Sequence, residues 1–149
     1  MWRRNRVTSS TDLIEMRDTL ADERGELADA QDDASDAVEA EPDSQELIDA
    51  YNEAEAALTE WERENTDRLA ALNTVCADGR ETFSDWDEGI QLIAESDFPD
   101  HAREVASDIG CHTTDWPYNC IDWRDAANDL QVDYSSIEFE GVTYWGRSC

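Results

Sequence analysis

The sequence predicts an α+β protein in which an antiparallel helical (coiled-coil) hairpin is followed by a small domain of helices and a C-terminal β-hairpin. Three observations indicate this fold class: heptad-spaced apolar residues on both sides of one proline, the return of aromatic, Gly and Pro residues near residue 79, and alternating apolar residues around a glycine turn near the end. We expect a basic N-terminal tail (1–10), an acidic helical arm (11–77) and a compact α+β domain (78–149).

The arm is predicted to contain two helices, because Ala, Leu, Glu, Asp, Gln and Arg predominate in it. The helices are expected to separate at residues 41–44, since Pro42 disfavours helical geometry in the preceding residue and Asp43 or Ser44 can cap the next helix. Seam positions alternate steps of three and four residues, as in a coiled coil. They are Leu13, Met16, Leu20, Glu23, Leu27, Ala30, Ala34 and Ala37, then Leu47, Tyr51, Ala54, Leu58, Trp61, Asn65, Arg68, Leu72 and Val75.

Folding the chain at Pro42 pairs seam positions whose numbers sum to about 85. This register sets Ala34 against Tyr51, so that a small residue faces a large one near the turn. Such complementarity favours a hairpin within one chain. The same register places Glu23 opposite Trp61, which puts a polar residue into the seam.

The compact domain is expected to contain three helices. The first is predicted near 86–95, and the second runs from Pro99 to Ile109 with Gly110 as its stop. The third runs from Asp122, its expected cap, to Leu130.

A β-hairpin is predicted over 134–145, where apolar residues alternate around Glu140 and Gly141. The aromatic residues of the domain are expected to form its core: Trp86, Trp116, Trp123, Tyr134, Phe139 and Trp145.

The charge of the chain excludes whole classes of partner. Its 149 residues include 38 Asp or Glu and 11 cationic residues, all arginine, for a net charge of −27. Direct binding to nucleic acid or to an anionic membrane is excluded, because both need clustered cations. With neither a membrane-length apolar run nor an apolar signal segment, we expect a cytoplasmic protein.

The sequence offers no catalytic constellation, and we expect a protein that is not an enzyme. Cys76, Cys111, Cys120 and Cys149 are predicted to be reduced thiols. A metal site could join Cys111, His112 and Cys120, with Cys149 or His101, but it lacks any zinc-like spacing. We therefore expect no metal and no cofactor.

Carboxylates recur at three- and four-residue steps beside each seam, and so form stripes. Between positions 12 and 67 there are 21 acidic residues and three Arg, a net charge of −18. On an arm of roughly 45 Å this is about one charge per 2.5 Å, against about 1.7 Å for duplex DNA. Eight of these carboxylates are predicted to stand in for phosphates: Asp22, Asp29, Asp33, Asp36, Asp49, Glu53, Glu60 and Glu64.

The last third of the chain resembles the C-terminal part of ArdA-type antirestriction proteins and related small acidic phage and prophage proteins. The resemblance rests on Phe98 to Gly110, on Trp116-Pro117, on Ile121 to Leu130 and on the hairpin from Tyr134 to Trp145. His101 occupies a position where that pattern has tyrosine. The resemblance implies a mobile-element protein that mimics DNA and blocks restriction enzymes, especially type I systems.

Together these features predict a non-enzymatic inhibitor from a phage or mobile element, acting in the host cytoplasm. Its expected partner is the basic DNA-binding cleft of a host defence complex of the restriction or CRISPR type. The alternatives are a structural or assembly coiled-coil protein of a mobile element, which uses the arm as a spacer or dimerisation rod, and an acidic halophilic adaptor. A homodimer is left open.

Overall fold

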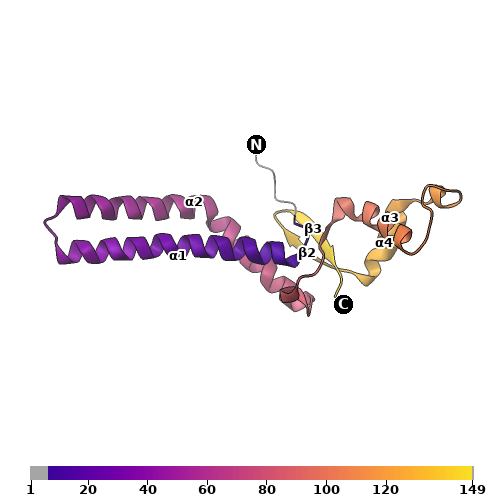
Figure 1. The fold of residues 1–149 in the computed structure, drawn as a ribbon, viewed down its shortest axis with the longest axis horizontal. Coiled ribbons are helices and arrows are strands. Elements are labelled where there is room, and N and C mark those ends of the chain that lie inside the picture. The colour runs from indigo at the N-terminus through magenta and orange to yellow at the C-terminus, as the bar shows by residue number, and fades with distance from the viewer. Residues whose placement is uncertain (1–6, 149) are drawn as a thin grey trace. The chain divides into compact units, whose positions relative to one another are not determined.

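Residues 7–148 are described by a computed structural model of the chain, which confirms the predicted α+β class (Figure 1). The helices are α1 (Ser10–Ala40), α2 (Gln45–Thr82), α3 (Phe98–Asp108) and α4 (Trp123–Leu130). The strands are β1 (Ile93–Ala94), β2 (Ser135–Phe139) and β3 (Val142–Gly146).

The chain packs as two units. One contains residues 15–73, the other contains 7–14 together with 74–148, and each long helix has residues in both. The division of the chain at residues 10 and 77 stays a prediction.

The hairpin formed by α1 and α2 is confirmed, as is the break between them at residues 41–44 (Figure 1). Ser44 begins the second helix as expected, because its Oγ accepts a hydrogen bond from the backbone N–H of Leu47 at 3.4 Å. Helix α2 continues to Thr82, beyond the composition change. Seam residues such as Leu27 and Leu58 are half-buried, since a hairpin of two helices covers each seam on one side.

Two contacts across the hairpin confirm the predicted register. Trp61 Nε1 donates a hydrogen bond to Glu23 Oε2 at 3.0 Å, and Arg24 forms an ion pair with Glu62 at 3.4 Å. The residue numbers in these pairs sum to 84 and 86. Residues on α1 and α2 whose numbers sum to about 85 therefore lie at the same level along the hairpin.

The predicted β-hairpin is confirmed and belongs to a three-stranded antiparallel sheet of order β1-β3-β2. Glu140 and Gly141 form its two-residue turn with positive φ angles of 50° and 78°, the geometry that matches the strand twist. The third strand, β1, was not predicted. It pairs with β3 through Ile93 and Ala94, and two residues are too few to show an alternating pattern.

The predicted helix over 86–95 is wrong, because the backbone in this segment pairs with the start of the chain. The Leu92 N–H donates to Thr8 O at 2.9 Å, and the Ser10 N–H donates to Ile90 O at 2.9 Å. Buried Ser10 also accepts from the Ile90 N–H through its Oγ and donates to Trp86 O, both at 2.8 Å. Residues 8–10 of the expected tail are thus bonded to this segment, and residues 1–6 lie outside the described part of the chain.

Helices α3 and α4 agree with their predicted positions and ends. Gly110 follows α3 with a φ of +98°, and the Asp122 side chain caps α4 by accepting from two backbone N–H groups. The two helices pack on a core of Ile93, Phe98, Ala102 and Ala127, joined by Trp123, Leu130, Tyr134 and Trp145. Trp86 and Phe139 are buried as expected. The prediction that Trp116 is a core residue is wrong, because it is 80% exposed.

Among the described residues, no helix is both apolar enough and long enough to cross a lipid bilayer.

His101 is partly buried against Phe98 and Tyr134 of the α3–α4 core, and its environment predicts a stability that depends on pH. Its Nε2 lies 3.1 Å from the Tyr134 hydroxyl, and its ring meets Phe98 edge-on. Burial lowers the pKa of His101, although Glu104 and Asp108 act in the opposite direction. The unfolded chain therefore binds a proton more readily, so this residue's contribution to stability is complete above the unfolded pKa near 6.5 and falls at lower pH.

We expect His101→Phe to remove that dependence. The melting temperature of wild type relative to the variant should decrease as the pH is lowered from 7.5 to 5, because only wild type must hold an imidazole neutral. Thermal unfolding followed by circular dichroism measures this difference, and Tyr134→Phe controls for the lost hydrogen bond. A constant difference across this pH range would contradict the prediction.

Candidate functional site: the acidic surface of the helical hairpin

All eight carboxylates predicted to contact a partner are exposed on the hairpin unit. Asp22, Asp29, Asp33 and Asp36 come from α1, and Asp49, Glu53, Glu60 and Glu64 come from α2. We call this set the carboxylate surface.

The register brings members of the carboxylate surface from the two helices to common levels. Asp36 lies level with Asp49, and Asp33 lies level with Glu53. Near the other end of the unit, Asp22 lies level with Glu64. Negative charge therefore recurs in steps along both helices, instead of converging at one point.

Arginine neutralises little of this charge. Arg63 forms an ion pair with Glu60 one helical turn away, and the hydrogen bond from Arg63 holds the pKa of Glu60 below its ordinary value. The same bond raises the pKa of Arg63. One-to-one pairing with the three Arg residues of positions 12–67 would leave 18 of the 21 acids without a cation from that stretch. The surface is thus strongly anionic at neutral pH.

The hydrogen bond between Glu23 and Trp61 is a feature that the seam pattern did not predict. Trp61 is 9% exposed while Glu23 reaches solvent, so the carboxylate accepts from the indole N–H at the edge of the seam. The sequence did contain a signal for this bond, because Glu23 is a charged residue at a seam position where the heptad pattern has apolar residues. This contact helps to fix the register on which the spacing of the carboxylate surface depends.

We expect Glu23 and Trp61 to be coupled by about 1 kcal/mol, the usual net value of a hydrogen bond in a protein. Glu23→Ala should destabilise the hairpin because the part-buried indole N–H of Trp61 loses its acceptor. The double variant with Trp61→Phe should then cost less than the sum of the two single changes. Urea unfolding of the four proteins in a double-mutant cycle measures this coupling.

The ion pair of Arg24 with Glu62 provides the matched control for this cycle. Its side chains are 56% and 41% exposed, so Arg24→Gln should change stability by no more than about 0.5 kcal/mol. Strict additivity of Glu23→Ala and Trp61→Phe would show that the hydrogen bond contributes nothing to the register.

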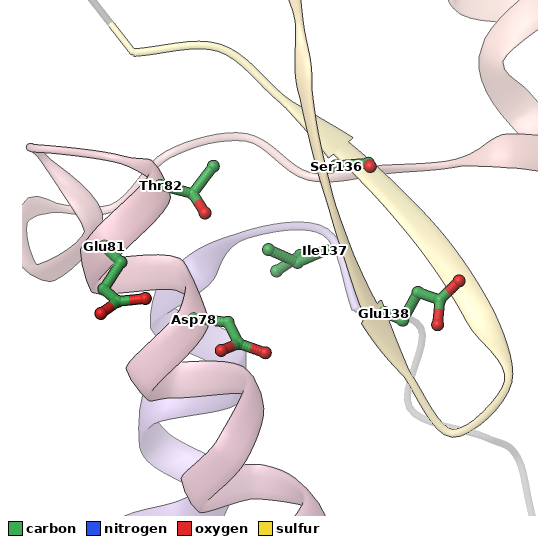
Figure 2. A pocket seen from close by; sticks show the side chains of 6 residues that line it. All are labelled: Asp78, Glu81, Thr82, Ser136, Ile137 and Glu138. Atoms are coloured by element: carbon green, nitrogen blue, oxygen red, sulfur yellow. The ribbon is translucent and has the colours of Figure 1, made fainter.

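A second group of carboxylates, not predicted from the sequence, lies beside the sheet. A pocket of about 360 Å³ is lined by Asp78, Glu81, Thr82, Ser136, Ile137 and Glu138. Figure 2 shows Ile137 pointing toward α2, whereas the carboxylate of Glu138 turns away from it. The acidic groups therefore share a region without converging on a common centre.

Within residues 7–148, no three His, Cys, Asp or Glu side chains form a group that could hold a metal ion. Cys111 and Cys120 are free thiols, and the Cys120 Sγ lies 3.4 Å from Asn119 Oδ1. Cys149, the other candidate ligand, lies outside the described residues. The expected lack of a metal, cofactor and catalytic site stays a prediction.

The fold and its acidic surface define an α+β protein with a highly charged helical hairpin. Comparison with family models, curated proteins and solved structures gave no match. The resemblance to ArdA-type proteins stays a prediction, and the function is inferred from the surface itself.

Proposed function

We propose that the protein is a non-enzymatic inhibitor from a phage or mobile element that imitates the DNA backbone. It would act in the host cytoplasm by occupying the basic DNA-binding cleft of a restriction or CRISPR-type defence complex. The observation that carries this proposal is the carboxylate surface, whose eight members are all exposed on two helices of fixed register.

The density of charge supports imitation of a nucleic acid. A helix of 31 residues such as α1 is about 45 Å long at 1.5 Å per residue. The net charge of −18 over that length approaches the linear charge density of duplex DNA. A cleft that presents Arg and Lys to phosphates at such intervals can pair with carboxylates presented on a rigid support.

The cost of this charge also supports a function that uses it. Like charges three or four residues apart on a helix destabilise it by about 0.2 to 0.5 kcal/mol per pair. Most seam residues of the hairpin unit are only half-buried, so little apolar burial is available to offset many such pairs. Solubility of a small domain needs a net charge of only about 2 to 8 in magnitude. A basic partner supplies the missing counter-charge.

A competition experiment tests the proposal. A purified type I restriction–modification complex is mixed with labelled duplex DNA carrying its recognition site, and the protein is added. We expect it to displace the DNA and to inhibit cleavage, with an affinity that falls steeply as salt increases. Lack of displacement at low salt would contradict action on this class of complex.

Salt also separates the alternatives. An acidic halophilic adaptor should gain folding stability in molar KCl, a condition in which a DNA mimic loses its affinity for a basic cleft. An assembly rod should instead self-associate through the hairpin at high salt without displacing DNA.

A further inference from the structure

The connection between α3 and α4 exposes side chains that a folded chain usually buries. In the described part of the chain, the exposed large hydrophobic residues all fall between positions 109 and 132. Ile109 is 78% exposed and Trp116 is 80% exposed, and Tyr118 and Ile121 follow in the same connection. We call these four residues the apolar loop surface. Isolated exposed residues of this kind are common, but here four of them fall within one connection of 13 positions.

The backbone of this connection is held by hydrogen bonds along its length. The Cys111 N–H donates to Ala106 O, the Asp115 N–H to His112 O and the Asn119 N–H to Asp115 O. Trp116 is therefore presented to solvent by a bonded turn. A surface ordered in this way loses little conformational entropy when it binds.

The charge of the segment that carries the apolar loop surface indicates what kind of partner it can bind. Positions 108–133 carry six Asp and one Arg, a net charge of −5 if His112 is neutral. A second copy would bring the same negative charge against it, and an anionic membrane would be repelled as well. A protein surface with an apolar depression bordered by Arg or Lys complements both the side chains and the charge.

We propose that the apolar loop surface is a second contact, by which the protein inserts Trp116 into an apolar depression of a basic partner protein. Tryptophan is enriched among the residues that dominate binding energy, because it covers a large area with few rotatable bonds. The identification of that partner with the inhibited complex rests on the proposed function. The chemistry of the contact is independent of the proposed function, since it follows from the exposure of Trp116 and the charge of the segment.

The test uses the full chain labelled with 5-fluorotryptophan, in which Trp116→Phe assigns one fluorine resonance. The probe is a synthetic helical peptide with Leu on one face and Arg on the other, and the control peptide carries Ser in place of Leu. We expect the Leu/Arg peptide to shift the Trp116 resonance, and Trp116→Ala to weaken its binding about tenfold. Thr114→Ala, an exposed change in the same connection, should keep the affinity within about twofold. The Ser/Arg peptide should bind wild type and Trp116→Ala alike.

Three results would overturn the inference. The first is equal binding of the Leu/Arg peptide by wild type and Trp116→Ala. The second is a dimer in sedimentation experiments that Trp116→Ala abolishes, which would make a second copy the occupant. The third is binding of phosphatidylcholine vesicles through Trp116. Failure of the wild-type protein to displace DNA from the type I complex would contradict the proposed action on that class of complex and would leave this inference standing, because the peptide results do not depend on it.

Discussion

Replacement of Asp29, Asp33, Asp36 and Glu53 by Asn or Gln should weaken inhibition of the type I complex by roughly 10- to 100-fold at low salt. Four lost charges mean four fewer contacts with cations of the cleft, so the dependence of affinity on salt should also become less steep. The stability of the fold should not decrease. Asp29, Asp33 and Asp36 repel one another at steps of four and three residues, and their neutralisation should leave the melting temperature unchanged or raise it.

A variant with the same change in net charge provides the control. Glu88, Glu95, Asp100 and Asp129 are exposed residues of the other unit, and their neutralisation should leave inhibition near the wild-type value. If the hairpin variant inhibits as well as wild type does, the hairpin is a spacer, and residues from Gly79 onward become the place to look.

Gly79→Ala should destabilise the protein by about 2 kcal/mol, although alanine favours a helix more than glycine does by about 1 kcal/mol. Gly79 lies within α2, where a Cβ atom would come 2.5 Å from Cε3 of Trp86. Trp86 is 1% exposed and stacks near Phe83 with ring centroids 6.1 Å apart, so it has little room to move. Urea unfolding measures the loss.

The other helical glycine supplies the matched comparison. A Cβ atom at Gly25 in α1 would meet nothing within 4 Å, so Gly25→Ala should stabilise the hairpin by about 1 kcal/mol. If Gly→Ala lowers the stability at position 79 and raises it at position 25, the effect of close packing is distinguished from that of helix propensity. A gain in stability at both positions would show that the Trp86 side chain can shift away from residue 79 at little cost in free energy.

The elements predicted correctly from the sequence are those whose signals lie in neighbouring residues. Pro42 and Ser44 mark the turn between long periodic segments, Asp122 marks a helix start, and Glu140 with Gly141 marks a β-turn. The elements that were missed depend on residues far apart in the chain. Strand β1 exists because Ile93 and Ala94 pair with β3, and the backbone after Trp86 is held by residues 8–10.

The same distinction applies to the candidate site. Exposure of the carboxylate surface followed from its offset from the seam, and the register followed from the heptads. The hydrogen bond of Trp61 to Glu23 and the exposure of Trp116 could not be predicted in this way. Composition alone cannot distinguish an aromatic residue in a core from one on a surface.

The hairpin unit is inserted between two segments that together make the other unit, since residues 7–14 pack with 74–148. An insertion of this kind can change in size without altering the sequence that surrounds it. Removal of residues 28–34 and 51–57, which lie at matching levels, would shorten the hairpin by about 10 Å and keep the seam in phase. The length of the charged surface is therefore adjustable in heptad steps, and evolution or protein design could fit it to clefts of different length while the remaining residues stay the same.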